Sequence, residues 1–252
     1  MYKRQIAHRG NVHGGVENSL EALESAKKIG ADYAELDIQL TRDNHFVVMH
    51  DYNLQRLTGR NARVRDLTLD EIKTLTIREN NFESRIPTFE EYVNKAKKIN
   101  IKLLVEIKPS GDEPEDFAEM FIKKFRKLGV EKTFKVMSLD LDLMRKIERI
   151  DPVIETGFVI PIQFGDFDDS KIDFYVIEDF SYRSGLAFKA HKKHRKIFVW
   201  TLNTQSEISR YLQEPIDGII SDEIQMIEDI EKEDRSKEPI LKSFVRLLKL
   251  RF

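Results

Sequence analysis

Short runs typical of β-strands alternate with helix-like runs along nearly the whole chain, and this order limits the possible folds most. Segments such as NSLEALESAKKIG and TFEEYVNKAKKIN have apolar residues at helical spacing and acidic residues near their starts. Eight such strand–helix units within 252 residues predict an α/β fold, the TIM (β/α)8 barrel. The expected strands are Arg4 to His8, Tyr33 to Ile38, Leu103 to Ile107, Thr133 to Met137, Ile154 to Ile160, Asp173 to Ile177, Ile197 to Thr201 and Gly218 to Ile220.

Two segments depart from the regular order. About fifty residues separate the second strand from the next helix, so we expect a small insertion after this strand, over approximately 45–87, at the barrel mouth. The barrel domain is expected to span 1–230, because EDIEKEDRSKEP then begins a charged stretch with few apolar residues. Residues 231–252 are expected to form a charged linker and a basic amphipathic C-terminal segment.

Composition excludes several classes of function. The 42 basic and 44 acidic side chains give a net charge of -2, so no global field favours a nucleic-acid partner. The absence of cysteine excludes disulfides, thiolate catalysis and cysteine-based zinc sites. No apolar run approaches the length that spans a bilayer, which predicts a soluble chain as written. Its localisation stays open between the cytoplasm and the extracytoplasmic domain of a membrane-linked protein.

Several carboxylates fall near the C-terminal ends of expected strands, where TIM barrels collect their reactive groups. Glu35 and Asp37 are two residues apart on the second strand and therefore point inward together, and Glu106 and Lys108 repeat this spacing on the third. Three inward carboxylates predict a site for one divalent cation, Mg²⁺ or Ca²⁺. The alternative is a structural ion network with Arg9 and Lys108. Burying several charges for stability alone is seldom better than an apolar core, which favours the cation site.

His8 and His50 are the candidate proton carriers, because each follows an apolar strand-like run and histidine titrates near neutral pH. Asp51 has two open roles, orienting His50 or capping the following turn. The other histidines, at positions 13, 45, 191 and 194, occupy polar or basic contexts and are expected at the solvated surface.

The segment GNVHGGVENSLEAL is rich in glycine, but it lacks the P-loop lysine and the dinucleotide-binding spacing. It is expected to be a flexible entry to a helix capped by Asn18. Glu17 and Asn18 lie on the loop that leaves the first strand, where both are expected to face the neighbourhood of the cation. No G-x-S-x-G element is present, which leaves a serine hydrolase without its nucleophile.

The chain resembles the glycerophosphodiester phosphodiesterase family from Gln5 to about Ile230. The resemblance rests on ordered motifs at similar intervals: IAHRG, ENSLEAL, ELDIQLTRDNHFVVMHD, IPTFEEYV, LLVEIK and VWTLN. It departs from the family's pattern at VMSLD and VIEDFSY, where substrate groups beyond the phosphate would contact the protein. The resemblance therefore implies the class of reaction more firmly than the substrate.

The resemblance also implies roles for individual residues. Glu35, Asp37 and Glu106 would ligate the cation, and His8 and His50 would be the general acid/base pair. The phosphate and the rest of the substrate would contact Arg9, Glu17, Lys108 and Trp200. The implied reaction is metal-dependent hydrolysis of a small-molecule glycerophosphodiester to an alcohol and sn-glycerol 3-phosphate. Attack by water and attack by a neighbouring substrate hydroxyl, through a cyclic intermediate, both remain open.

Two rival functions are considered. A phospholipase D-like enzyme would use a related barrel and similar residues on lysophospholipids. A non-catalytic phosphate-ester binding barrel would be expected to have lost a proton carrier or a ligand, and the sequence retains all of them.

The C-terminal segment gives a further expectation about partners. Some motifs look most like the soluble domains of Gram-positive members that carry an N-terminal membrane region. Contact of residues 237–252 with an anionic membrane surface would fit this subgroup, because the segment is basic and amphipathic. The alternative is a closing helix packed on the barrel, which needs the same apolar stripe.

Overall fold

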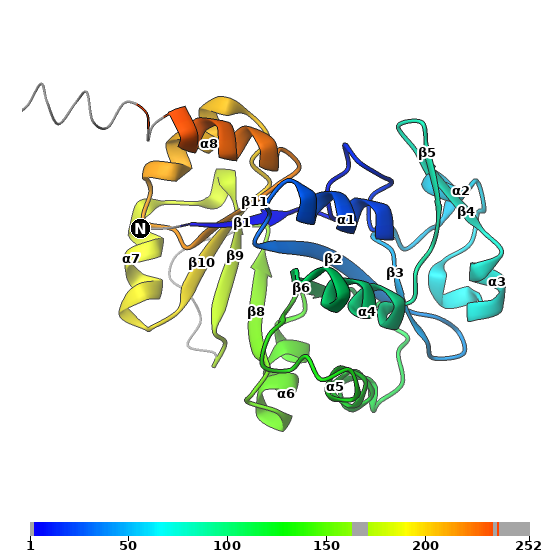
Figure 1. Cartoon of the computed structure of the whole chain (residues 1–252). Helices are drawn as coiled ribbons and strands as arrows, with labels where there is room; N and C mark the ends of the chain where they lie inside the picture. The colour runs from blue at the N-terminus through cyan, green and yellow to red at the C-terminus, as the bar shows by residue number, and fades with distance from the viewer. Residues whose placement is uncertain (1–2, 163–170, 234–235, 237–252) are drawn as a thin grey trace, which may run out of the picture.

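The computed structural model describes residues 3–162, 171–233 and 236, and its main feature is a closed barrel (Figure 1). One sheet has the strand order β1-β11-β10-β9-β8-β7-β6-β2-β3, and pairing of β1 with β2 closes it. The predicted TIM barrel is confirmed. Among the described residues, the eight parallel strands are β1 (Arg4–Ala7), β2 (Tyr33–Leu40), β6 (Lys102–Ile107), β7 (Lys135–Ser138), β8 (Glu155–Ile160), β9 (Phe174–Glu178), β10 (Lys196–Trp200) and β11 (Gly218–Ser221).

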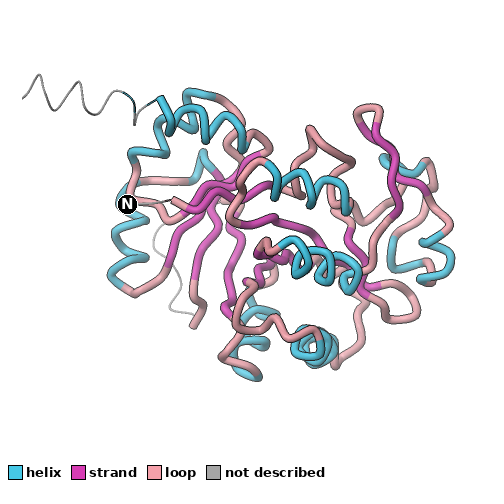
Figure 2. Tube along the Cα trace, in the orientation of Figure 1, coloured by secondary structure: helices cyan, strands magenta, loops and turns pink. Residues whose placement is uncertain are grey.

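Helices pack on the outside of the barrel (Figure 2). Several begin at a residue whose side chain accepts a hydrogen bond from the first turn, as Ser19 does for α1 and Thr88 for α4. Their apolar sides bury outward-facing strand residues such as Leu36 and Ile38. The helices are α1 (Leu20–Lys28), α4 (Phe89–Ile99), α5 (Phe117–Lys127), α6 (Leu141–Ile150), α7 (Ser184–Lys192), α8 (Gln205–Gln213) and residues 224–233.

The middle of the barrel interior is apolar. Phe174 and Phe198 lie in an inner cluster with Leu104 and Val159, all buried. Gly157 on β8 makes this packing possible, because a Cβ there would overlap the Phe174 ring. This packed layer separates the polar side chains at the C-terminal ends of the strands from the charged side chains at their N-terminal ends, such as Lys135 and Glu155.

The insertion after β2 forms a small layer beside the barrel, seen at the right of Figure 1. It begins with β3 (Phe46–Val48), which runs antiparallel to β2. The chain returns where the Val48 N–H donates to the Pro87 carbonyl, 2.9 Å away. Between these points lie α2 (Gln55–Thr58), the 3-10 turn η1 (Val64–Asp66), α3 (Leu69–Lys73) and the hairpin of β4 (Thr76–Glu79) and β5 (Phe82–Arg85).

This insertion has its own apolar cluster, which includes Leu54, Leu57 and Ile72. Val47 and Met49 of the β3 segment belong to the same cluster. The packing therefore fixes the chain on both sides of His50, which lies two residues after the end of β3.

Residues 224–233 are helical, and Ile224, Ile227 and Ile230 are buried against the barrel helices. The predicted amphipathic segment at 237–252 lies outside the described residues. None of the described helices combines the length and the apolar character needed to cross a bilayer.

Candidate active site

The three predicted carboxylates meet at the mouth of the barrel. Glu35 and Asp37 point inward from β2, and Asp37 stands opposite Glu106 in the register of β2 with β6. Carboxylate oxygens of the three lie within 4.8 Å of one another. Glu35 and Asp37 are almost fully buried, at 2% and 1% exposure. The strand register therefore brings together Glu35, Asp37 and Glu106, which the two-residue period of β-strands predicted to face inward.

Charges at this cluster are only partly balanced. Burial and the neighbouring carboxylates raise the pKa of Glu35 well above its ordinary value and that of Glu106 to about 7. Burial opposes ionisation of Asp37 as well, but Lys108, His50 and Arg9 lower its pKa. The Lys108 Nζ lies 3.6 Å from Asp37 Oδ1 and 3.7 Å from Glu106 Oε1. Asp37 is thus held in its charged form, whereas full ionisation of Glu35 and Glu106 requires a further positive charge nearby.

The donor set fits a hard divalent cation. Among the buried side-chain atoms that the structure describes, Glu35 Oε1 has no hydrogen-bond partner. Buried polar oxygens usually have a partner, so this atom is available to a ligand. Carboxylate oxygens suit Mg²⁺ and Ca²⁺, whereas no cysteine or neighbouring pair of histidines marks the site for a softer metal.

Asn18 has a different role from the predicted helix cap. Ser19 caps α1, and its side chain accepts from the Ala22 N–H. Asn18 instead donates to Asp37 Oδ2 at 2.8 Å and accepts from the Asp37 N–H at 3.2 Å. The expected cap was wrong by one residue, because the Asn18 side chain bonds Asp37 of β2 and Ser19 caps the helix. Asn18 thereby positions a candidate cation ligand.

Arg9 contacts the carboxylate cluster through both its backbone and its side chain. Its N–H donates to Glu35 Oε2 at 2.8 Å, and its Nε lies 3.7 Å from Asp37 Oδ2. The guanidinium also donates to Glu17 at 3.1 Å. Arg9 is therefore fixed beside the carboxylate cluster, with its charged guanidinium at the mouth of the barrel.

Two histidines also lie at the barrel mouth, and each is held by an acidic side chain. His8 Nδ1 lies 2.9 Å from Asp222 Oδ1, and His50 Nδ1 lies 2.8 Å from Asp51 Oδ1. An ionised carboxylate only accepts hydrogen bonds, so each Nδ1 carries the proton and Nε2 is left for a substrate. Burial and Arg9 lower the pKa of His50 against the opposing charge of Asp37.

Asp51 is therefore the partner of His50 rather than a cap. In the following turn, the side chain that accepts a backbone hydrogen bond is that of Asn53, from the Gln55 N–H at 2.9 Å. Asp222 was not predicted from the sequence. It follows β11 in IISDE, and its position at the end of a barrel strand was the available signal.

A cavity of about 170 Å³ joins these groups. Trp200, at the end of β10, borders it with apolar neighbours, and its buried Nε1 has no partner among the described atoms. Glu17 is buried but does not line this cavity, because Arg9 and Arg56 bind its carboxylate. The lining is His8, Arg9, Glu35, Asp37, His50, Glu106, Lys108, Met137, Leu139, Val159, Val176, Trp200 and Ile220.

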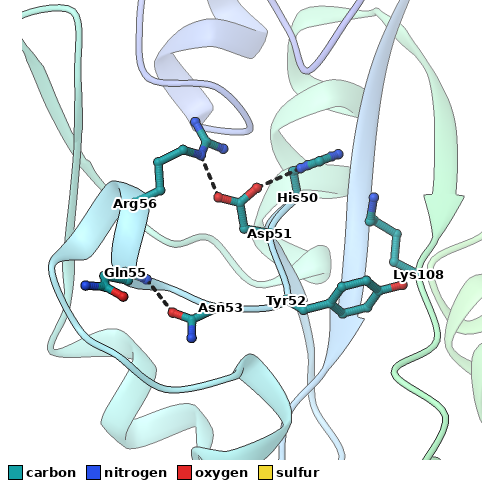
Figure 3. Close-up of a pocket in the computed structure, with 7 residues that line it drawn as sticks. All are labelled: His50, Asp51, Tyr52, Asn53, Gln55, Arg56 and Lys108. Atoms are coloured by element: carbon teal, nitrogen blue, oxygen red, sulfur yellow. Dashed lines mark hydrogen bonds and ion pairs between the residues drawn. The ribbon is translucent and has the colours of Figure 1, made fainter.

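A wider cleft of about 620 Å³ adjoins the cavity, and the two share His50 and Lys108 (Figure 3). The Tyr52 hydroxyl donates to the Pro109 carbonyl at 3.0 Å, which fixes the ring at the border of the cleft. The cleft opens toward the insertion, so a ligand larger than a phosphate has room beside His50.

A second acidic group, formed by Glu17, His50 and Asp51, also has the spacing of metal ligands. The guanidinium of Arg56 lies against it and bonds both carboxylates at 2.5 Å. The positive charge that these residues require is therefore already supplied, and the group at Glu35, Asp37 and Glu106 is the better cation site.

The chain is similar to known proteins along most of its length. Residues 8–226 match the model of the glycerophosphoryl diester phosphodiesterase family. A glycerophosphodiester phosphodiesterase of Caldanaerobacter subterraneus is 29% identical over 86% of this chain and 93% of its own. The crystal structure of a Parabacteroides distasonis glycerophosphodiester phosphodiesterase is 26% identical, with a TM-score of 0.81, and covers 92% of this chain and 98% of its own. That of the Thermotoga maritima enzyme is 26% identical, with a TM-score of 0.74, and covers 91% and 99%.

The family match begins at His8, directly after β1, and ends in the helix after β11, so it includes every residue that lines the cavity. The chain therefore belongs to the glycerophosphoryl diester phosphodiesterase family.

Proposed function

We propose that the protein hydrolyses small-molecule glycerophosphodiesters to an alcohol and sn-glycerol 3-phosphate, using one divalent cation, Mg²⁺ or Ca²⁺. The observation that carries the proposal is the carboxylate cluster of Glu35, Asp37 and Glu106, which shares one cavity with two histidines and two fixed cationic side chains. Family membership supports the same reaction.

Glu35, Asp37 and Glu106 would hold the cation, and Arg9 and Lys108 would bind the phosphate. A bound divalent cation neutralises charge on a non-bridging phosphate oxygen and so stabilises the transition state. Lys108 and Arg9 act on the same charge from fixed positions, because Asp37 anchors both.

His8 and His50 would transfer the protons. With Nδ1 held by Asp222 or Asp51, the Nε2 of one ring takes the proton of the attacking hydroxyl. The Nε2 of the other ring protonates the leaving alkoxide. The same pair serves attack by water and attack by a substrate hydroxyl, so the cyclic route and the direct route both stay open. Trp200 would shape the alcohol side of the pocket. Glu17 would hold Arg9 in place.

The test is incubation of the protein with glycerophosphocholine in the presence of Mg²⁺, Ca²⁺ or EDTA. We expect sn-glycerol 3-phosphate and choline with a cation, and neither product with EDTA. Turnover that persists in EDTA would contradict the carboxylate site. Binding of the ester without turnover under all conditions would instead favour the non-catalytic barrel.

Lysophospholipid cleavage is the second candidate, and one observation favours it. Leu139 lines the cavity and is 48% exposed, and Ile162 and Phe180 are similarly exposed just beyond the C-terminal ends of β8 and β9. Such side chains at the mouth suit an acyl chain. Lysophosphatidylcholine in the same assay decides between the two, because lysophosphatidate appears only with this activity.

The raised carboxylate pKa values predict how pH affects stabilisation by the cation. The pKa of Glu106 is about 7 against an ordinary 4.5, so its contribution to stability without metal is present below 4.5 and lost as pH rises through 7. A cation that binds the ionised form should therefore raise Tm more at about pH 8 than at about pH 5.5. Thermal melts with and without Mg²⁺ measure the difference. An equal rise at both pH values, or an unchanged response in Glu106→Gln, would contradict it.

Contact of residues 237–252 with a membrane stays a prediction, since this segment lies outside the described residues. The full chain should bind anionic liposomes more strongly than a chain ending at Glu233, because basic residues near such a surface contribute about 1 kcal/mol each. Sedimentation with liposomes measures both. Equal binding would leave the packed closing helix as the role of this segment.

A further inference from the structure

Arg56 is a residue of the insertion that bonds the acidic partner of His50. It lies on α2, and its Nε bonds Asp51 Oδ2 at 2.5 Å, while Asp51 Oδ1 contacts His50 Nδ1 at 2.8 Å. Figure 3 shows the three side chains in line, with Asp51 between the guanidinium and the imidazole. We propose that Arg56 is a positioning residue, which acts through Asp51 to fix the ring and the tautomer of His50. This inference rests on the proposed catalytic role of His50.

The carboxylate of Asp51 needs a second partner to do this. A carboxylate with a single contact can rotate, whereas one held on both oxygens presents a fixed acceptor. Burial opposes the ionisation of Asp51, but Arg56 and His50 lower its pKa to about 2. An ionised Asp51 has no proton to donate, so His50 must donate through Nδ1 and keep Nε2 unprotonated while the ring is neutral.

Arg56 is itself fixed by two other carboxylates. Its terminal nitrogens contact Glu17 at 2.5 Å and Glu79 of β4 at 3.3 Å. Glu79 also accepts from the Glu17 N–H at 3.1 Å, which joins the hairpin of the insertion to the loop after β1. The insertion therefore contributes Arg56, in addition to His50 and Asp51, to the geometry of the barrel site.

Two routes lead from Arg56 to the substrate, and they predict different kinetics. Through Asp51 it orients His50, which would carry protons in the rate-determining chemistry. Through Glu17 it borders Arg9, which would bind the phosphate in both ground and transition states. Loss of the first route lowers kcat, and loss of the second raises KM. The direct contact with the partner of His50 favours the first.

The test compares Arg56→Met with Arg60→Met, an exposed arginine four residues further along the same segment. We expect Arg56→Met to lower kcat at least about tenfold with little change in KM, the scale on which partners that orient reacting groups act. Arg60→Met should match the unmodified protein. Arg56→Lys should recover part of the loss, because a lysine restores the charge but not the planar fork. Where Arg56→Met fails to fold, Arg56→Lys carries the comparison.

Two further measurements separate positioning from a merely structural role. Nitrogen-15 NMR of histidine-labelled protein with Mg²⁺ should show a single His50 tautomer, protonated at Nδ1, and a mixture in Arg56→Met. In an Asp51→Asn background, Arg56→Met should have almost no additional effect on kcat, since the Asp51 carboxylate that links Arg56 to His50 is already absent.

Three outcomes would overturn the inference: additive losses, an unchanged His50 spectrum, or a loss confined to KM. Each of these leaves the proposed function intact if His50→Gln is inactive. Wild-type turnover by His50→Gln would instead remove the proposed role of His50, so failure of the two proposals can be told apart.

Discussion

Glu35→Gln should abolish both cation binding and turnover while leaving the fold intact. Its raised pKa means that the metal-free protein already favours a neutral side chain at this position, and glutamine has nearly the same shape. The Oε2 bond from the Arg9 N–H can be kept by the amide oxygen. What is lost is the negative charge that a divalent cation requires, since hard cations prefer anionic oxygen ligands.

The expected loss is large because the cation acts mainly in the transition state. Its stabilisation of charge amounts to several kcal/mol, and each 1.36 kcal/mol corresponds to a tenfold change in rate, so turnover should fall by about 10³-fold or more. Titration calorimetry with Mg²⁺ and steady-state rates on glycerophosphocholine measure the two effects.

Glu178→Gln is the matched control. Glu178 also ends a barrel strand, β9, but does not line the cavity, so its variant should keep both binding and rate. Activity in Glu35→Gln at more than about a tenth of the normal rate would show that the carboxylate cluster is the structural ion network instead, since a lost ligand costs at least this factor.

His8→Ala and His50→Ala should each lower kcat/KM by roughly 10²-fold or more without weakening cation binding. Neither histidine belongs to the carboxylate cluster, and each is held through Nδ1 by its own acidic partner. The loss should therefore appear in proton transfer alone. Steady-state kinetics measures the rate, and His13→Ala is the control, because His13 is exposed and contacts Glu223 outside the cavity.

A substrate with a nitrophenol leaving group can assign the two roles. Nitrophenolate leaves without protonation, so the variant that lacks the general acid should regain much of its rate, and the variant that lacks the base should not. Equal recovery of both variants, or near-normal rates in either with glycerophosphocholine, would remove the acid/base assignment.

The sequence predicted the barrel and the inward orientation of its carboxylates, because both depend on patterns within short segments. Strand periodicity places Glu35 and Asp37 on one face of β2, and the same spacing in Glu106 and Lys108 repeats on β6. Parallel strands align their C-terminal ends, so these four residues had to meet at one mouth once the barrel was inferred.

The predicted cap at Asn18 failed although the helix itself was expected. Asn and Ser are both common cap residues, so ENS allowed either as the first turn's acceptor. The bond of Asn18 to Asp37 crosses from one βα unit to the next, and this competition is not visible in the segment alone.

Sequence periodicity was sufficient to predict the strands and helices of the barrel and which side chains face inward, because both follow from periods of two and 3.6 residues within short segments. The partner of His8, and the residue that fixes Asp51 beside His50, depend instead on tertiary packing. Closure of the barrel pairs β1 with β11 and brings Asp222 to His8 across 214 positions, while packing of the insertion sets Arg56 against Asp51. Such contacts depend on how separate elements pack, and no local spacing in the chain encodes them.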